Sequence, residues 1–197
     1  LDQAFAIEAS GRDLLLHYAI ADVAWFVADG DPVDTEAWQR GTTTYLPDGK
    51  APLYPPVLSE RAVCLLPDGP RAAIILTVRI APDGESRLEG AERALIRSRA
   101  KLAYDRVQDA NLPDGFSEIG RRIALAEDRR GASRVDPPEQ ELEPDGHGSY
   151  ALRFRPYLPS EANNAALSLA ANLAVADVML KHQTGLFRVM GPPTHEA

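Results

Sequence analysis

The tripeptide Pro-Asp-Gly occurs five times along the chain, and it limits how long any regular element can be. The copies lie at residues 47–49, 67–69, 82–84, 113–115 and 144–146. Proline presets φ and glycine accepts positive φ, so the tripeptide favours tight turns between elements. The spacing of the copies is irregular, which argues against a solenoid or propeller of equal repeats. The sequence therefore predicts short elements joined by turns.

Two of the segments between these turns have strong strand patterns. Residues 14–27 (LLLHYAIADVAWFV) are apolar, partly β-branched and aromatic, which predicts a buried strand that leads into a loop near Asp22. Residues 73–80 (AIILTVRI) predict a second strand. Because the turn at 82–84 follows directly, we expect this strand to pair with residues 87–96 as a hairpin.

Two shorter segments predict helices from their capping residues. Asp31 followed by Pro32 is typical of an N-cap and first helical residue, here for a helix through residue 40. Ser117 is the expected N-cap of a second helix through residue 130, which Gly131 ends.

The longest predicted helix follows Ser160 and ends before Gly185. Its apolar residues recur at three- and four-residue steps, which predicts a buried stripe. That stripe comprises Ala165, Leu169, Leu173, Ala176 and Leu180. By contrast, residues 134–148 are rich in Pro, Glu and Asp without an apolar period, and they predict an exposed loop. Together these elements predict a mixed α/β (α+β) domain, with one β-sheet wrapped by helices.

Composition narrows the class of protein. Hydrophobic residues make up 45% and charged residues 25%, as in an average globular domain. The single Cys64 excludes an internal disulfide and a zinc site built on several thiolates. No apolar run approaches the roughly 20 residues of a membrane helix, so we expect no membrane partner. The single cysteine favours a reducing compartment, so we expect a cytoplasmic protein. The net charge of −8 argues against bulk electrostatic binding of nucleic acid, although basic clusters remain. They comprise Arg93, Arg97, Arg99 and Lys101, and Arg121, Arg122, Arg129 and Arg130.

Several classes of enzyme are excluded because their sequence motifs are absent. The four histidines are scattered, and the chain has no Gly-x-Ser-x-Gly elbow, P-loop or Gly-x-Gly-x-x-Gly fingerprint. Carboxylates and aromatic rings remain, and a hard cation such as Mg²⁺ prefers carboxylate oxygens. Rings beside such a site can stack on unpaired bases. Each residue also has an ordinary structural role open to it, as a cap, a loop filler or a surface group. The candidates are Asp2, Asp22, Tyr45, Tyr104 and Glu161.

Several segments, in the same order and spacing, resemble the catalytic domain of the ribonuclease II family. They are LDQAFAIE, HYAIADVAWFV, RGTTTYLPDGKAPLYPPVLSERAVCLLPDGPRAAIILTVRIAPDGE, RSRAKLAYDRVQ and AANLAVADVMLKHQTGLFRVMGPP. The resemblance covers nearly the whole chain. Its Leu-Asp-Gln-Ala start is similar to a subgroup found in high-GC bacteria.

This resemblance implies an RNB-type fold and a 3′→5′ exoribonuclease that hydrolyses single-stranded RNA with Mg²⁺ and releases 5′-mononucleotides. It places Asp2 on the second aspartate of the family's Asp-x-Asp-Asp metal motif, as a catalytic metal ligand. Tyr45 falls on the tyrosine that stacks against RNA, and Tyr104 on the tyrosine near the terminal ribose. The role of each residue is an expectation that follows from the family.

The chain also departs from the family pattern. Gln3 stands where the last aspartate of the metal motif is expected, and its neutral amide would bind Mg²⁺ more weakly. The acidic pair expected on the last helix is replaced by Ala165 and Ala166. Glu161, one turn earlier, or Asn164 is the expected substitute, and we place Glu161 with the substrate-binding residues.

The resemblance further implies that residues 1–197 are part of one RNB-type catalytic domain whose N- and C-terminal portions are missing. The first aspartates of the motif, a phosphate-clamping arginine region and OB-type RNA-binding domains would then lie elsewhere on the same parent chain. Two alternatives to an enzyme stay open. Gln3 motivates an RNA-binding or regulatory module that has weakened or lost hydrolysis, and the 197 residues alone could be a structural segment without autonomous function.

Overall fold

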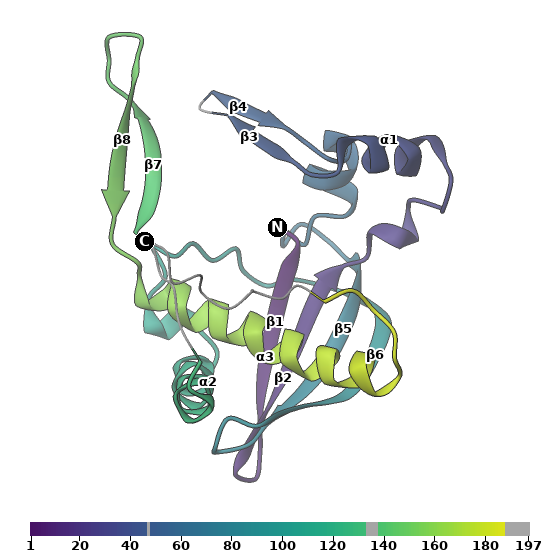
Figure 1. Cartoon of the computed structure of the whole chain (residues 1–197), viewed down its shortest axis with the longest axis vertical. Coiled ribbons are helices and arrows are strands. Elements are labelled where there is room, and N and C mark those ends of the chain that lie inside the picture. The colour runs from purple at the N-terminus through teal and green to yellow at the C-terminus, as the bar shows by residue number, and fades with distance from the viewer. Residues whose placement is uncertain (47, 133–137, 188–197) are drawn as a thin grey trace, which may run out of the picture.

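The computed structural model describes residues 1–46, 48–132 and 138–187, and a four-stranded antiparallel sheet forms its centre (Figure 1). The strands run in the order β1-β2-β5-β6. Each neighbouring pair is antiparallel. The bounds of these strands are β1 (Gln3–Ser10), β2 (Asp13–Ala21), β5 (Arg71–Ile80) and β6 (Ser86–Ile96).

The sheet has two ends of different construction. The short connections β1–β2 and β5–β6 lie at one end, where Ser10 pairs with Asp13 and Ile80 pairs with Ser86. We call this the turn end. β1 begins at the opposite end, which we call the open end.

The predicted hairpin is confirmed, and both of its strands are longer than expected. β5 and β6 pair from Arg71 opposite Ile96 to Ile80 opposite Ser86. In the connecting turn Gly84 has φ +84°, and a Cβ there would lie 2.1 Å from the carbonyl oxygen of Arg122. Only glycine therefore fits this turn, because it meets both a left-handed backbone and a neighbouring helix.

The strand predicted within residues 14–27, leading into a loop near Asp22, is confirmed. β2 ends at Ala21, and a 3₁₀ turn, η1 (Val23–Trp25), follows. The Trp25 N–H donates to the Asp22 carbonyl at 3.3 Å, which closes the turn. The chain therefore leaves the sheet at Asp22, although the apolar run in the sequence continues to Val27.

One of the two short-helix caps is confirmed and the other is wrong. Asp31 caps α1 (Pro32–Arg40), because its Oδ1 accepts the Asp34 N–H at 2.8 Å. The second helix, α2 (Phe116–Arg130), begins one residue before Ser117. The Ser117 side chain therefore does not cap it. Phe116 is buried and stacks on Phe5 of β1, with ring centroids 5.4 Å apart, so packing rather than a capping side chain sets this start. Gly131 ends the helix in the left-handed conformation, as predicted.

The long helix is confirmed as α3 (Pro159–Lys181), but the predicted buried stripe is wrong. Of that stripe, Leu169 packs partly against the core, Ala176 is half-buried, and Leu180 is 62% exposed. The helix is apolar on several faces, so periodicity does not identify the buried one. The sheet and α2 contact the face with the smallest side chains, which allows the closest approach. Its buried apolar residues are Ala166, Leu167, Ala170, Ala171 and Ala174.

The core lies between α2, α3 and one face of the sheet. Gly120 of α2 faces Asn163 of α3, and a Cβ at Gly120 would lie 2.0 Å from the Asn163 Oδ1, so glycine lets the two helices meet. The cluster contains Leu14, Leu16, Tyr18, Val78, Ile80, Phe116, Ile119, Ile123 and the buried face of α3. The opposite face of the sheet carries a smaller cluster of Ala19, Leu65 and Ala73.

Two separate hairpins accompany the sheet, β3 (Thr44–Leu46) with β4 (Gly49–Ala51), and β7 (Glu139–Pro144) with β8 (Tyr150–Arg155). The predicted exposed loop over residues 134–148 is therefore wrong from Glu139 to Pro144, while residues 134–137 lie outside the described residues. The described side chains of β7 are exposed, as expected. Cross-strand pairing, rather than burial of an apolar face, makes this strand, which is why its sequence lacks an apolar period.

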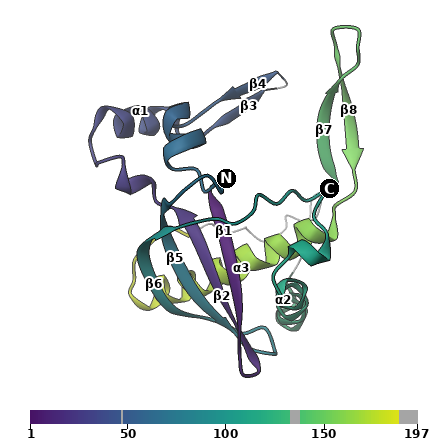
Figure 2. The same cartoon turned by 180° about the vertical axis from the view of Figure 1, so that it is seen from behind.

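The fold class is confirmed as mixed helix and sheet. α3 crosses in front of the sheet in Figure 1 and behind it in Figure 2, so it covers one face. Both separate hairpins project beyond the open end; in Figure 1 β3–β4 lies above the N-terminus and β7–β8 to its left. The remaining short elements are the π-helical turn η2 (Leu58–Ala62) and the 3₁₀ turn η3 (Asp109–Asn111). Within the described residues, no helix has the length and apolar character needed to cross a membrane.

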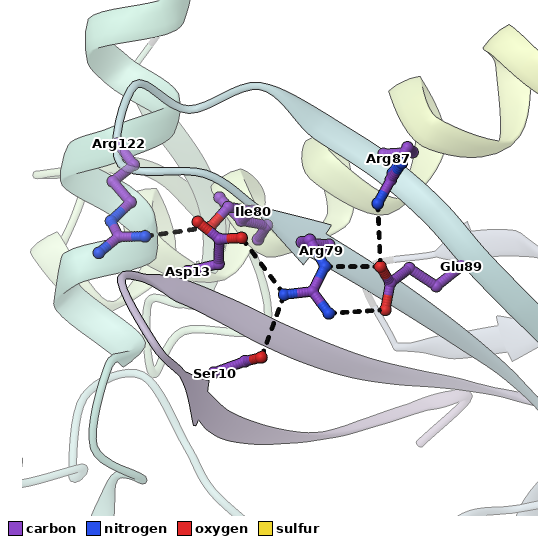
Figure 3. A network of polar contacts seen from close by, with 7 residues as sticks. All are labelled: Ser10, Asp13, Arg79, Ile80, Arg87, Glu89 and Arg122. Atoms are coloured by element: carbon purple, nitrogen blue, oxygen red, sulfur yellow. Dashed lines mark hydrogen bonds and ion pairs between the residues drawn. The ribbon is translucent and has the colours of Figure 1, made fainter.

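The turn end of the sheet is held by charged groups in contact with one another (Figure 3). Arg79 contacts Glu89 through Nε at 2.5 Å and through Nη2 at 3.1 Å. Its Nη1 donates to Ser10 at 3.1 Å and to Asp13 at 3.2 Å. Arg122 donates from α2 to the carbonyl of Ile80 at 3.0 Å. These contacts connect all four strands and α2.

Candidate functional site

Asp2 lies at the open end, immediately before β1. Backbone hydrogen bonds fix the chain on both sides of it: the Ala21 N–H donates to the Asp2 carbonyl at 2.8 Å, and the Leu65 N–H donates to the Leu1 carbonyl at 2.8 Å. The Asp2 side chain is exposed, and its carboxylate makes no hydrogen bond or ion pair with any residue that the structure describes. A fixed backbone thus presents an unpaired carboxylate to solvent.

The neighbouring Gln3 begins a chain of neutral hydrogen bonds that we call the amide–phenol relay. The Tyr18 hydroxyl donates to Gln3 Oε1, and Gln3 Nε2 donates to Asn164 Oδ1 at 3.3 Å. Asn164 Nδ2 in turn donates to the Tyr104 hydroxyl at 3.0 Å. The relay joins β2, β1, α3 and the segment that leads from β6 to α2. It brings together Gln3 and Tyr104, which are 101 positions apart in the sequence.

Both phenols of the relay stay protonated at neutral pH. Burial is the main reason that the pKa of Tyr104 is raised, with further contributions from the negative charges of Glu161 and Asp2. Burial also raises the pKa of Tyr18, and Asp2 and Tyr104 add to this effect. Asp2 directly precedes Gln3 in the chain, which agrees with the effect of its charge on both rings. Each hydroxyl therefore remains a hydrogen-bond donor beside an anionic group.

Glu161 lies at the start of α3, and contacts from the chain occupy both of its oxygens. Arg155 of β8 donates to Oε2 at 2.8 Å and to Oε1 at 2.7 Å, and the Leu158 N–H donates to Oε2 at 2.8 Å. These bonds with Arg155 hold the pKa of Glu161 below its usual value. The carboxylate caps α3 and anchors the β7–β8 hairpin. Its predicted part in substrate binding stays a prediction.

Tyr45 stands apart from the other predicted site residues. It lies in β3 opposite Lys50 of β4, and its side chain is 79% exposed. Lys50 is held by Glu60 at 3.0 Å, which connects the hairpin to η2. No contact joins Tyr45 to the relay within the described part of the chain. A ring on a projecting hairpin is suitable for stacking, and this role stays a prediction.

Sequence reasoning missed two polar partners of the site and misjudged the place of a third residue. Tyr18 and Ser160, whose Oγ donates to the Tyr104 carbonyl at 2.9 Å, were not predicted. The alternation of β2 could have placed Tyr18 on the same face as Gln3 of the neighbouring strand. Asp22, considered as a ligand from sequence, instead lies buried in an ion pair with Arg93, at 2.8 Å. Asn164 lies within the relay.

A cavity of about 850 Å³ opens beside β1 and includes part of the relay in its wall. Its polar lining includes Gln3, Tyr104, Ser160 and Asn164, and its apolar lining includes Phe5 and Phe116. The segment from Arg97 to Pro113 lines much of the remainder. The space is comparable to the binding clefts of small ligands, which occupy about 300–1,000 Å³.

The donors present suit a hard cation that shares its coordination with a substrate. Mg²⁺ commonly takes one or two carboxylates and fills its other positions with water and substrate phosphates. Asp2 supplies one such carboxylate, while the Gln3 oxygen already accepts from Tyr18. No group of three or more His, Cys, Asp or Glu side chains in the described residues is arranged as a metal cage. The residues thus fit a Mg²⁺ ion that takes one ligand from Asp2 and its other ligands from water and substrate phosphates.

Comparisons with known proteins agree on one family. The sequence model described as "RNB domain" matches residues 1–197. The exosome complex exonuclease RRP44 homolog A of Arabidopsis thaliana is 31% identical over 90% of this chain and 21% of its own length. The inactive exonuclease DIS3L2 of the same organism is 35% identical over 60% of this chain and 11% of its own length.

Comparison with solved structures finds the same fold in a ribonuclease R. The structure of ribonuclease R from Mycoplasma genitalium, in complex with ribose-methylated single-stranded RNA, superposes with a TM-score of 0.83 at 23% identity. The match covers 93% of this chain and 31% of that one. The chain therefore spans a third or less of the length of these relatives.

Proposed function

The chain belongs to the RNB domain family, and from this membership we propose that it contributes to the active site of a Mg²⁺-dependent 3′→5′ exoribonuclease. The proposed reaction is hydrolysis of the terminal phosphodiester of single-stranded RNA. Water adds to phosphorus, the bond to the 3′ oxygen of the preceding nucleotide breaks, and a 5′-mononucleotide leaves. The observation that carries the proposal is the unpaired Asp2 carboxylate beside the amide–phenol relay.

In the proposed mechanism Asp2 acts as a metal ligand. When bound, Mg²⁺ would activate the attacking water and stabilise the negative charge that develops on the phosphate oxygens. The backbone bonds from Ala21 and Leu65 hold Asp2 in place before substrate arrives. Little reorganisation is then needed at the moment of reaction, which is the main contribution of a preorganised site.

The relay positions the terminal nucleotide. Tyr104 is 46% exposed and is held through its hydroxyl by Asn164 and through its carbonyl by Ser160. The ring therefore has one orientation in which to contact a ribose or base. Tyr45, on the β3–β4 hairpin, stacks against RNA further from the reacting bond. Both roles rely on fixed rings that limit the motion of a flexible strand.

The decisive test compares Asp2→Asn with Asp29→Asn in the protein incubated with 5′-labelled single-stranded RNA and Mg²⁺. Asp29 is an exposed aspartate without a hydrogen bond or ion pair in the described residues, so it is a matched control. Removing an outer-shell group of a metal site lowers activity about 10- to 100-fold, so we expect loss of a metal ligand to lower the cleavage rate by more than this. Shortened labelled products should appear with the parent and the control. Equal rates for Asp2→Asn and the parent would contradict the proposal.

Gln3 favours a second candidate, an RNA-binding module with weakened or lost hydrolysis. Its amide supplies no negative charge at a position where the family resemblance predicts an aspartate, and its oxygen is bound by Tyr18. One relative carries the name of an inactive exonuclease. This candidate predicts RNA binding without product in the parent.

The substitution Gln3→Asp separates the two candidates. If Gln3 is the defect, Gln3→Asp should create or raise Mg²⁺-dependent cleavage without changing RNA affinity measured in EDTA. Gln39→Asp is the control, because Gln39 is exposed on α1 and its substitution adds the same negative charge away from the site. A parent that already cleaves at the rate of Gln3→Asp would exclude the binding-only candidate.

A further inference from the structure

A second aromatic and basic group lies at the open end, away from the amide–phenol relay. Asp22 directly follows Ala21, whose N–H bonds to the Asp2 carbonyl. The Asp22 carboxylate is only 4% exposed and pairs with Arg93 of β6, at 2.8 Å from Nε and 3.2 Å from Nη2. The Arg93 guanidinium carbon lies 5.7 Å from the centre of the Trp25 ring. One buried acid therefore positions a guanidinium, which in turn supports an indole.

This arrangement leaves its aromatic group in solvent. The Trp25 side chain is 57% exposed, although one face of its ring is turned to Arg93. A guanidinium over one face restricts the ring and makes the ring's position more definite. An ion pair that served stability alone would not require an exposed indole. The opposite face of the ring is suited to stack on a flat ligand.

The register of the sheet connects this group to the proposed active site. Gln3 is opposite Ile20, Ile20 is opposite Ile74, and Ile74 is opposite Arg93. Residues directly opposite one another in antiparallel strands project to the same face. Gln3 and Arg93 thus lie on one face at one end of the sheet. Three strand-to-strand steps separate them by about 14 Å.

The charge of the surrounding chain favours an anionic ligand. Arg97, Arg99 and Lys101 follow Arg93 on the way to Tyr104, and all three are exposed. None of the three makes an ion pair or hydrogen bond within the residues that the structure describes. The whole chain has a net charge of −8, so the positive charge of this segment is opposite in sign to the charge of the chain. A phosphodiester backbone matches such a track.

We propose that Trp25 and Arg93 form a second nucleotide-binding position, which stacks a base of single-stranded RNA on the indole and attracts its phosphate with the guanidinium. The position rests on the proposed function in one respect: it takes a nucleotide upstream of the one held at Tyr104. Base stacking on an aromatic ring is tolerant of sequence. The position therefore increases RNA affinity and helps to place the strand, without selecting a particular base.

The test measures RNA affinity in EDTA, where no hydrolysis interferes. Replacing a stacking ring by alanine costs about 1–3 kcal/mol per base, which is a 5- to 150-fold change in Kd. We expect Trp25→Ala to weaken binding of a labelled single-stranded RNA within this range and Trp25→Phe to retain most of the affinity. The matched control is Trp38→Ala, because Trp38 is 80% exposed on α1. Unfolding midpoints of the variants confirm that the fold is kept.

Each outcome decides the proposal. Equal Kd values for Trp25→Ala and Trp38→Ala, or no RNA binding by the parent, would overturn it. Equal losses for Trp25→Ala and Trp25→Phe would also overturn it, since phenylalanine keeps a stacking face. If Trp25→Ala alone loses affinity while the parent does not cleave RNA in Mg²⁺, the nucleotide position stands and the proposed hydrolysis fails. Intrinsic fluorescence gives a second readout, because Trp38→Phe leaves Trp25 as the only tryptophan, and RNA should quench it.

Discussion

The two ends of the central sheet differ in how fully their charged groups are paired. At the turn end, Arg79 contacts Glu89, Asp13 and Ser10, and Arg122 contacts Ile80 and Glu118, so the charged groups have partners. At the open end, Asp22 and Arg93 form an ion pair, but Asp2 has no partner among the described residues, and the relay beside it consists of neutral hydrogen bonds. The comparison indicates that one end maintains the fold while the other leaves polar groups available for a ligand.

The largest effect is expected where the turn end meets α2. Gly84→Ala places a Cβ 2.1 Å from the carbonyl oxygen of Arg122, on a backbone with φ +84°. We expect a loss of about 2–4 kcal/mol in the free energy of unfolding, measured in urea. Gly11→Ala is the control, because Gly11 also has positive φ but no atom within 4 Å of the added Cβ. Equal losses at both positions would show that backbone strain alone is responsible.

A smaller loss of stability is expected from Arg122→Met. Arg122 is 8% exposed, and it donates to the buried carbonyl of Ile80 at 3.0 Å. Removing this donor leaves the carbonyl without that bond, which costs about 1–3 kcal/mol. Arg121→Met is the control, because Arg121 binds the same Glu118 but is exposed. If both variants unfold at the same urea concentration, the bond to Ile80 does not hold the turn end.

At the open end the same kind of change should affect activity rather than stability. Asn164→Ala removes the link between Gln3 and Tyr104. If Tyr104 positions the terminal nucleotide, we expect kcat/KM for RNA to fall about tenfold, which is about 1.4 kcal/mol. Asn172→Ala, two turns further along α3, is the control, since the Asn172 side chain donates to Ser168 and has no hydrogen bond to Gln3 or Tyr104 among the described residues. A loss of stability that exceeds the loss of activity would make the relay a structural feature.

The sequence predicted elements that depend on local chemistry. The β5–β6 hairpin follows from the turn at 82–84, and Asp31 caps α1 through a bond to a residue three positions away. The sequence did not predict features that depend on distant partners. The start of α2 is set by Phe116 against Phe5, and the buried face of α3 is set by close contact with α2.

The candidate site shows the same division. Asp2 and Tyr104 were candidates as a carboxylate and an aromatic ring, and the family resemblance gave them their expected roles and singled out Gln3. Tyr18 and Asn164, 15 and 161 positions from Gln3, become its partners only in the folded chain. Ala166, where the resemblance expects an acid, lies in the core, so a carboxylate there would be buried. A local pattern therefore predicts a candidate residue but not the side chains that surround it.

The smallest expected effect concerns acid stability at the turn end. Arg121 and Arg122 lower the pKa of Glu118 from its ordinary value of 4.5 to about 2. A depressed folded-state pKa contributes stability that is fully present above the unfolded value and is lost as the pH falls toward about 2. Because the side chain is 35% exposed, solvent screening limits this contribution to about 1 kcal/mol or less. In urea unfolding, the parent should exceed Glu118→Gln above pH 5, and the difference should vanish on acidification. A difference that persists at pH 2 would mean that the amide fails to pack, and that charge at Glu118 does not stabilise the turn end.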